Sequence, residues 1–514
     1  MSTVSVSTEG SQQREFLGHP VGLWVCFGTE MWERFSYYGM RAILVLYLTK
    51  YHLYSTEKAT MVLGAYMAMV YMTPILGGYL ADRFLGSRKA VVYGGLLLVL
   101  GHVLMGFHGA PAFMDGETVV RDDSAISFFF LSLGLIVGGM GFLKANISTI
   151  VGSLYGPNDP RRDGGFSIFY MGINIGSFTS IAIVGYVGEN IGWNYGFALA
   201  GICMLFGLLV FLKGQPLLEG RADPPNPEEL KQKSPIGLSI ENTIYLGGLV
   251  LVLLSWQLLQ YQAVVGNLLL VCGAIMVGIV GFYSFKDCTK EERHRLFVAM
   301  FLITLQPLFW ALFEQQAGSL TLLADQKFDL NFLGMTFVAS QVQSMNPLFI
   351  IVFAPVMAWL WVSLARKGLD PSTPAKFAIA MLLIGGGFVL FALALGLDES
   401  SSKSFMWLVM LYWFMTVAEL CISPIGLSMI TKLSVPKIVG MMMGVWFLGL
   451  AFGNYLSGVI GSLTGSGGHG AAAGDVSVAA TIELYTNVGL FGIAVGVVVL
   501  LLTPLLRKGM HGVH

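Results

Sequence analysis

Long hydrophobic runs, separated by short polar segments, recur along the whole chain of 514 residues. An apolar run of about 20 residues is long enough to cross a bilayer as a helix. Fourteen runs reach this length, and we predict a membrane-spanning helix in each. They lie at 21–50, 56–82, 88–110, 125–153, 163–188, 194–213, 240–260, 263–285, 294–323, 331–366, 374–396, 404–433, 437–462 and 480–506.

The charges between these runs alternate. The segment after the second run holds Arg83, Arg88 and Lys89, whereas the next connection is marked by Asp115 and Asp122. Lysine and arginine concentrate in the cytoplasmic loops of membrane proteins. The alternation and the even number of runs therefore predict that both termini are cytoplasmic.

A segment rich in proline and charge, 214–239, follows the sixth run and divides the chain. The two runs after it carry almost no charge, apart from Glu241 at the edge, so the simplest arrangement is six helices, an inserted hairpin and six more helices. We predict the following units: a cytoplasmic tail at 1–20, a six-helix bundle at 21–213, a cytoplasmic linker at 214–239, a transmembrane hairpin at 240–285, a second six-helix bundle at 286–507 and a cytoplasmic tail at 508–514.

The composition agrees with an all-α integral membrane protein. Hydrophobic residues make up 55% of the chain and charged residues 11%, compared with about 25% charged residues in soluble domains. The 29 basic residues balance 30 acidic ones, so the net charge does not point to a nucleic-acid partner. We expect the five cysteines to be free thiols, and we expect no metal, no cofactor and no ATP-binding loop.

Four charged residues interrupt the first apolar run: Glu30, Glu33, Arg34 and Arg41. Their spacings of three, four and seven place them along one face of a helix. A charge at the centre of a bilayer costs at least about 2.5 kcal/mol. These residues are therefore expected to face a polar cavity and to neutralise one another in part.

Three more charges lie well inside other runs, away from their ends: Lys144, Glu314 and Glu419. The buried bases all come from the first half of the chain, whereas Glu314 and Glu419 come from the second. A cavity between the halves would then be positive on one wall and negative on the other. Such a cavity would orient a small zwitterion.

The second run ends in Gly77-Gly78-Tyr79-Leu80-Ala81-Asp82-Arg83, followed by Gly86, Arg88 and Lys89. This segment resembles the loop signature of the major facilitator superfamily, which implies two six-helix bundles and a gating role for Asp82 and Arg83. An ordinary basic loop would explain the arginines but not the paired glycines.

Three further motifs narrow the resemblance: Glu30-x-x-Glu33-Arg34, the segment 169–177 and the segment 419–426. They resemble motifs of the proton-dependent oligopeptide transporter (POT/PTR) family, whose bacterial members also carry an inserted hairpin. The resemblance implies a secondary active transporter rather than an enzyme: a proton-coupled symporter that imports di- and tripeptides by alternating access in the bacterial inner membrane. The intramembrane histidine of animal members has no counterpart here.

The resemblance and the charge pattern together imply a role for each candidate residue. Arg41 and Lys144 would hold the peptide carboxylate, with Arg34 nearby, and Glu419 would hold the amino group. Other substrate contacts are expected from Tyr38, Tyr71, Asn174, Trp310, Asn346, Ser423 and Trp446. Proton coupling is expected from Glu30, Glu33, Arg34 and Glu314, because a buried carboxylate that changes its cationic partner also changes its affinity for a proton.

Other interpretations remain open for these residues. Glu30 and Arg34 could form a purely structural pair, the aromatic residues could be packing residues, and Asn346 could satisfy backbone groups freed by Pro347. The same fold could carry nitrate, an amino acid or a drug, although nitrate would need no carboxylate facing Lys144. A membrane enzyme or a receptor is the other alternative. We expect a functional monomer whose partners are the peptide, protons and the bilayer.

Overall fold

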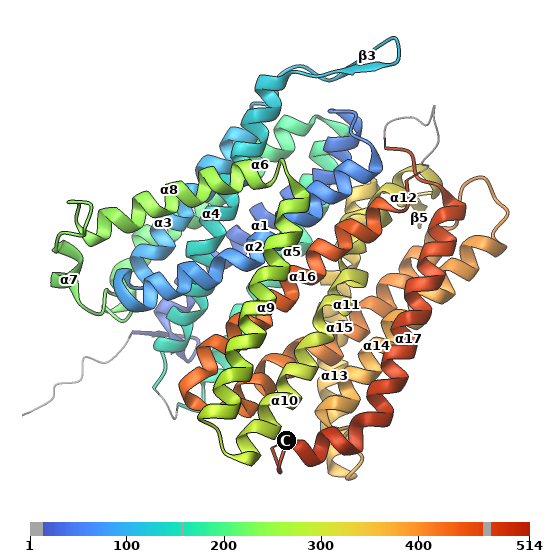
Figure 1. Ribbon diagram of the computed structural model, residues 1–514. Coiled ribbons are helices and arrows are strands. Elements are labelled where there is room, and N and C mark those ends of the chain that lie inside the picture. Colours follow the sequence, from blue (N-terminus) through green and yellow to red (C-terminus); the bar gives the residue numbers. More distant parts are fainter. Residues whose placement is uncertain (1–13, 157–158, 466–473, 514) are drawn as a thin grey trace, which may run out of the picture.

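A computed structural model describes residues 14–156, 159–465 and 474–513. It consists of two groups of long helices that stand side by side (Figure 1). The terminal face is the end of the molecule at which the first helix begins and the last helix stops. The far face is the opposite end. Most of the predicted tail at 1–20 lies outside the described residues.

The first bundle contains six long helices, each corresponding to one predicted run. They are α1 (Val21–Lys50), α2 (Thr56–Leu80), α3 (Ser87–Met105), α4 (Asp123–Ser153), α5 (Arg162–Asn190) and α6 (Trp193–Gly214). A π-helical turn, η1 (Ala81–Leu85), joins α2 to α3. The predicted run 88–110 ends early, because α3 stops at Met105.

The second bundle also provides six spans, two of which differ from the prediction. Its elements are α10 (Lys290–Thr304), α11 (Gln306–Phe313), η3 (Glu314–Ala317), α12 (Ser319–Lys327), η4 (Ala339–Ser344), α13 (Met345–Arg366), α14 (Thr373–Leu397), α15 (Phe405–Leu433), η5 (Pro436–Ile438), α16 (Val439–Ser462) and α17 (Val478–Gly509).

The prediction of one continuous helix over 294–323 is wrong. That span breaks beside Pro307, which has no N–H to donate, and again at Gly318. The prediction of helix from residue 331 is also wrong, since β5 (Asn331–Phe332) and β6 (Met335–Thr336) form a hairpin there. Its turn contains Leu333 and Gly334 with positive φ, a conformation that does not fit a helix.

Short elements complete the chain at both faces. The strands β1 (Glu15–Phe16) with β2 (His19–Pro20), and β3 (Phe113–Asp115) with β4 (Thr118–Val120), form antiparallel hairpins. The connection between the bundles contains the short helices η2 (Gln215–Leu218) and α7 (Pro227–Lys231).

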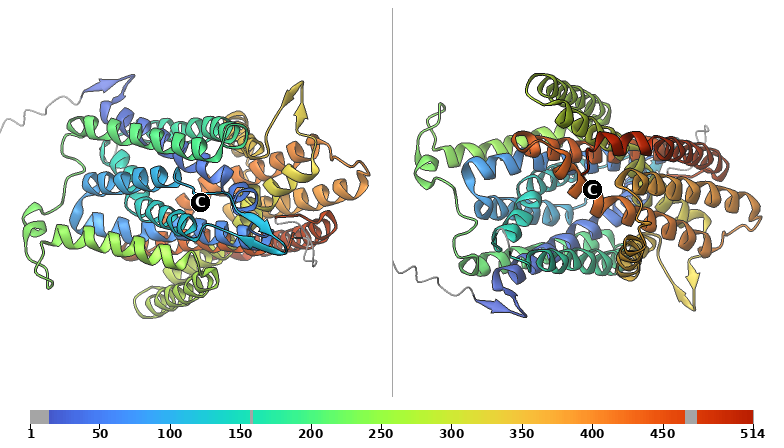
Figure 2. Two further views of the ribbon diagram at one scale, coloured as in Figure 1. Left: turned by 90° about the horizontal axis from the view of Figure 1, so that it is seen from above. Right: turned by 90° about the horizontal axis from the view of Figure 1, so that it is seen from below.

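The inserted hairpin consists of α8 (Ile240–Leu258) and α9 (Gln262–Lys286). Helix α8 packs on the first bundle, where Tyr93 donates a hydrogen bond of 2.7 Å to the carbonyl of Tyr245. Helix α9 packs on α16, with Gly266 against the ring of Tyr455. The hairpin therefore contacts both bundles, and the end views show it at the periphery (Figure 2).

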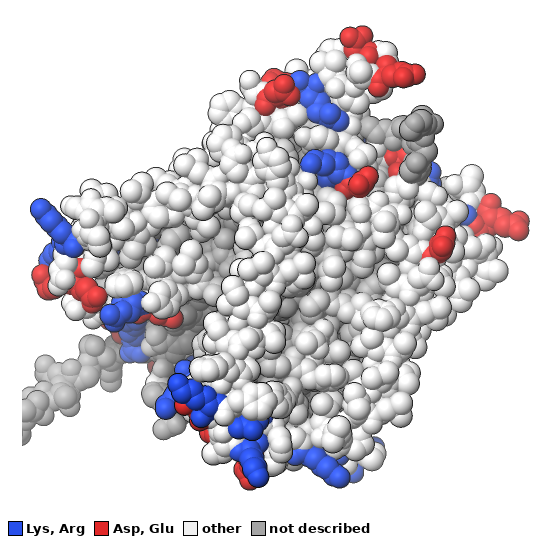
Figure 3. Space-filling model, in the orientation of Figure 1, with Lys and Arg blue, Asp and Glu red and all other residues white. Residues whose placement is uncertain are grey.

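Twelve helical segments among the described residues are long and apolar enough to cross a membrane. Helix α1, with its four internal charges, and α8, with a polar first turn, bring the number to the predicted fourteen. In the view of Figure 3, charged side chains gather at the two ends and leave a middle band without charge. These findings confirm the predicted fold class.

Glycines allow the helices of the first bundle to approach closely. A Cβ atom added at Gly77 of α2 would lie 2.0 Å from the carbonyl oxygen of Gly141 in α4. At the neighbouring Gly78, the nearest atom would be the Cβ of Ala145 at 3.5 Å, which is an ordinary contact. Only the first of the paired glycines is therefore required for this contact.

We expect Gly77→Ala to lower stability and Gly78→Ala to leave it nearly unchanged. Overpacking of this kind costs about 1–3 kcal/mol, because two backbones would have to separate. The measurement is the thermal unfolding midpoint of each purified variant in detergent. Equal midpoints for the two variants would contradict the contact described here.

Candidate functional site

A cavity of about 130 Å³ lies between the two bundles. Helices α1, α2 and α5 form one wall, and η3, α13 and α15 contribute to the other. Eight residues predicted from the sequence line it: Tyr38, Arg41, Tyr71, Asn174, Trp310, Glu314, Asn346 and Glu419.

The ion pair between Arg41 and Glu314 joins the bundles at this cavity. Arg41 Nη1 donates to Glu314 Oε2 over 2.9 Å, and both side chains are almost fully buried. Glu314 begins the 3₁₀ turn η3, which leads to the second break of this span at Gly318, so an irregular piece of backbone borders the cavity. Membrane proteins tolerate such backbone where it lines a cavity.

Glu419 and Asn346 form a second polar pair in the cavity. Asn346 Nδ2 lies 2.9 Å from Glu419 Oε2 and 3.2 Å from Thr416 Oγ1. The amide thus hydrogen-bonds to side chains of α15, in addition to any backbone role beside Pro347. With Arg41 opposite, the cavity brings together charges of opposite sign from separate bundles.

The cluster Glu30, Glu33 and Arg34 lies outside the cavity lining, nearer the terminal face. Arg34 Nε is 2.7 Å from Glu30 Oε1 and 2.8 Å from Glu33 Oε2, and all three residues are buried. One guanidinium therefore lies against two carboxylates, an arrangement that a simple i,i+4 pair would not produce.

Lys144 also lies outside the cavity lining, and its Nζ has no hydrogen-bond partner among the described residues. This atom lies 3.7 Å from the centre of the Tyr71 ring and 5.9 Å from that of Tyr37. Lys144 thus makes a cation–π contact with Tyr71, which itself lines the cavity. No hydrogen bond joins Lys144 to Glu419, since Lys144 Nζ has no such partner among the described residues.

Ser423 and Trp446 do not line the cavity either. The buried Trp446 ring packs against Gly426, where an added Cβ would lie 2.2 Å from the ring.

Sequence reasoning, conversely, missed several lining residues: Tyr170, Ser177, Ile181, Phe313, Gln316, Gln343 and Ile350. Tyr170 and Ser177 lie one turn on either side of Asn174, so helical spacing within the motif could have identified them.

Further polar contacts connect the bundles on the far-face side of the cavity. Gln343 Nε2 donates to the carbonyl of Ala42 over 3.1 Å, and Ser340 Oγ donates to Glu189 Oε1 over 2.5 Å. Lys50 Nζ lies 2.5 Å from Asp325 Oδ1. These contacts are further polar links between the two bundles.

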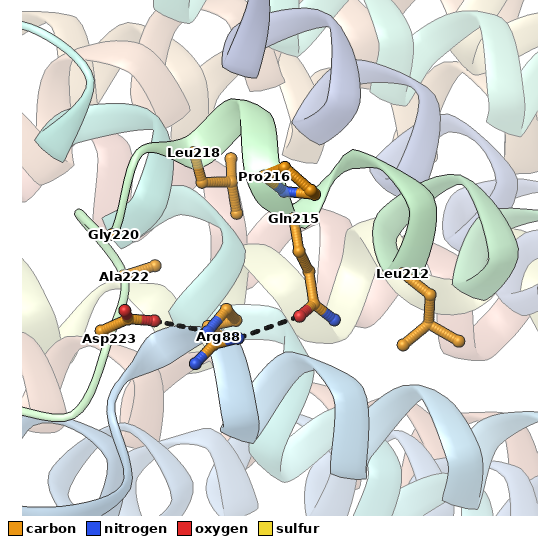
Figure 4. Close-up of a pocket in the computed structure, with 8 residues that line it drawn as sticks. All are labelled: Arg88, Leu212, Gln215, Pro216, Leu218, Gly220, Ala222 and Asp223. Carbon is orange, nitrogen blue, oxygen red and sulfur yellow. Dashed lines mark hydrogen bonds and ion pairs between the residues drawn. The ribbon is translucent and has the colours of Figure 1, made fainter. Parts of the chain in front are cut away.

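A second cavity, of about 360 Å³, lies on the terminal face (Figure 4). The Arg88 side chain reaches from the start of α3 to Asp223, 2.5 Å away, and to Gln215, 3.1 Å away. Gly86 has a φ of +72°, and an added Cβ would lie 2.5 Å from the nitrogen of Pro224. The connecting segment is thus docked on the first bundle beside the predicted gating loop.

The predicted gating residues themselves make few contacts. Asp82 and Arg83 are both exposed. The Arg83 guanidinium lies 3.9 Å from Glu229 of α7, a distance at which an exposed pair contributes little. Arg88, rather than Asp82, makes the closer polar contacts with the connecting segment.

The sequence profile of the POT family matches residues 88–473. The chain belongs to this family. An uncharacterised transporter of Bacillus subtilis is 36% identical and covers 98% of the chain and 97% of its own length. The peptide transporter YePEPT of Yersinia enterocolitica is 34% identical, with 98% of each chain covered. A di-/tripeptide transporter of Lactococcus lactis subsp. cremoris is also 34% identical, with 98% and 99% covered.

Solved structures of the family have the same fold. A mutant of a peptide transporter POT in complex with alafosfalin superposes with a TM-score of 0.82 at 34% identity, covering 97% of this chain and 98% of that one. A POT family transporter in complex with 5-aminolevulinic acid gives 0.80 at 31% identity, covering 96% and 98%. The fold is therefore that of the major facilitator superfamily, and the relatives are transporters rather than enzymes.

Within this POT family chain, we expect Arg41→Met to destabilise the fold strongly. Removing one member of a buried ion pair leaves the other charge unpaired, which costs about 3–5 kcal/mol. The double variant with Glu314→Met should recover much of the loss. Thermal unfolding midpoints test this expectation.

Lys50→Met is the control, because Lys50 is 43% exposed in its ion pair and a surface pair contributes about 0–1 kcal/mol. If Arg41→Met and Lys50→Met unfold at the same temperature, the Arg41–Glu314 contact is not the stabilising link described here.

Proposed function

We propose that this protein is a proton-coupled symporter that imports di- and tripeptides across the bacterial cell membrane. One observation carries the proposal: a cavity between two bundles in which Arg41 from one and Glu314 and Glu419 from the other are gathered. The printed names of two relatives, which describe a peptide and a di-/tripeptide transporter, support the substrate class.

The substrate site follows from the distribution of charge. A peptide carboxylate would approach Arg41, with Arg34 and Lys144 behind it, and its amino group would approach Glu419. Tyr38, Tyr71, Asn174 and Asn346 would hydrogen-bond the peptide, and Trp310 would border its side chains. Ser423 and Trp446 would contact the peptide only after α15 and α16 move.

The cavity's size implies such movement. Small-molecule sites usually have about 300–1,000 Å³, and this cavity has about 130 Å³. Binding would therefore require the bundles to separate. Rocking of two bundles around a site near the bilayer midplane is the usual means by which this fold alternates access.

Glu30, Glu33, Arg34 and Glu314 would couple this movement to protons. A buried carboxylate beside a cation stays ionised, whereas one that loses its cation takes up a proton. Bundle rocking that separates Arg41 from Glu314 would therefore favour protonation of Glu314. Protons would be the coupling ion, and no other cofactor is proposed.

The orientation in the membrane is also part of the proposal. The terminal face would be cytoplasmic, since it carries the Arg88 loop and the basic end of α17. Contacts on the far face would then close the periplasmic side, and the structure would face inward. The functional unit would be a monomer, with Asp82 and Arg83 on the cytoplasmic gating loop.

The alternative is transport of another small substrate by the same fold. The relative solved with 5-aminolevulinic acid makes an amino acid the strongest such candidate. Nitrate is less suited, because Glu419 would repel an anion. A drug-like substrate would occupy the same cavity as the peptide.

We expect purified protein in proteoliposomes to accumulate labelled dialanine when the lumen is alkaline and negative inside. Unlabelled tripeptide should compete, whereas nitrate should not. Free amino acids and 5-aminolevulinic acid form the comparison panel. Accumulation of one of these, with no competition by dialanine, would replace the proposed substrate.

Glu419→Gln tests the amine site. Hydrogen bonds to charged groups contribute about 1.5–3 kcal/mol, so the affinity for dialanine should fall roughly ten- to a hundredfold. Inhibition by N-acetyl-dialanine should change little, because that ligand has no charged amine. An equal loss for both peptides would remove Glu419 from the amine site.

A further inference from the structure

Two buried tyrosines lie between the predicted coupling groups without hydrogen bonds. The side chains of Tyr37 on α1 and Tyr66 on α2 are 0% exposed. Neither hydroxyl has a hydrogen-bond partner among the described residues. A buried polar group normally has a partner, and an unpartnered one calls for an explanation.

The positions of these tyrosines form a series along α1. Glu33, Tyr37 and Arg41 follow at intervals of four residues, so they share one face at steps of about 6 Å. Tyr66 stands beside this face, its ring centre 6.4 Å from that of Tyr37. Its neighbour Met67 contacts the Arg41 guanidinium through its sulfur at 3.9 Å.

Charged residues lie at both ends of this series. On α1, Tyr37 lies one turn after Glu33 and one turn before Arg41, and Arg41 pairs with Glu314 of the other bundle. The pair thus spans from the cross-bundle ion pair Arg41–Glu314 to the carboxylate of Glu33.

Other titratable groups lie near the two tyrosines. Lys144 of α4 lies 5.9 Å from the centre of the Tyr37 ring, and it also contacts Tyr71 of α2, which lines the cavity. Tyr412 of α15 has another buried hydroxyl without a partner among the described residues. An internal water molecule requires two to four hydrogen bonds, and unpartnered hydroxyls are groups that can supply them.

We propose that the hydroxyl groups of Tyr37 and Tyr66, together with water held between them, relay the coupling proton from Glu314 to Glu33. A tyrosine hydroxyl can accept and donate a hydrogen bond at the same time. This inference rests on the proposed proton-coupled function. It adds to the proton path two uncharged residues that do not line the cavity.

The transfer balances without any other reactant. Glu314, protonated when its contact with Arg41 is open, gives up its proton toward Tyr37. Each hydroxyl or water accepts one proton on oxygen and passes one on, and the Glu33 carboxylate receives the last. Both tyrosines end neutral, Glu314 can again pair with Arg41, and the newly neutral Glu33 releases its hold on Arg34.

The test compares Tyr66→Phe with wild type in proteoliposomes. We expect dialanine accumulation driven by a proton gradient to fall at least about tenfold, within the usual range for a lost proton-transfer group. Counterflow of dialanine without a gradient should stay at the wild-type rate, because the ring and the cavity are unchanged. Glu33→Gln should show the same split between the two measurements.

Tyr485→Phe is the matched control, since Tyr485 is also fully buried but its hydroxyl lies 2.7 Å from Ser319 Oγ. It should change driven uptake and counterflow in the same proportion. Tyr37→Phe is the second relay variant and decides the matter if Tyr66→Phe does not fold.

Each outcome is decisive. Unchanged driven uptake in Tyr66→Phe, or loss of driven uptake and counterflow together in a folded variant, overturns the relay. Wild-type protein that transports dialanine without dependence on the proton gradient overturns the proposed coupling instead. Selective loss of driven uptake in Tyr66→Phe, with driven uptake and counterflow still in their wild-type proportion in Tyr485→Phe, supports the relay.

Discussion

The free-energy cost of holding charge inside a bilayer governs the arrangement of this protein. Each buried cation and carboxylate must find an opposite charge or water, and no single helix can supply all of them. Arg41 finds its partner, Glu314, on the other bundle. This ion pair between the bundles therefore exists only while the bundles touch there, so separating them would leave both charges without their partner.

The remaining buried charges are neutralised in different ways. Arg34 is shared by Glu30 and Glu33. Glu419 accepts a hydrogen bond from an uncharged amide, and Lys144 lies on aromatic rings. A hydrogen bond from an uncharged group, or a cation–π contact, stabilises a buried charge less than an oppositely charged side chain does. Glu419 and Lys144 are thus the groups best able to accept new partners of opposite charge.

Much of this organisation could be predicted from the sequence, because apolar length and charge position are local properties. The positions of the fourteen spans, though not their internal breaks, and the common face of Glu30, Glu33 and Arg34 follow from simple spacing. The breaks at Pro307 and Gly318 were missed, since a long apolar run hides them. The pairing of Arg41 with Glu314, and the contact of Lys144 with the Tyr71 ring, depend on how separate helices meet, which spacing within one helix cannot show.

The docked connection between the bundles has a consequence for biosynthesis. Asp223 contacts Arg88, and Arg221 donates to the carbonyls of Ser153 and Leu154 at the end of α4. All these partners precede residue 224 in the chain. These contacts can therefore form as soon as residue 223 has been synthesised, before any part of the second bundle has been translated.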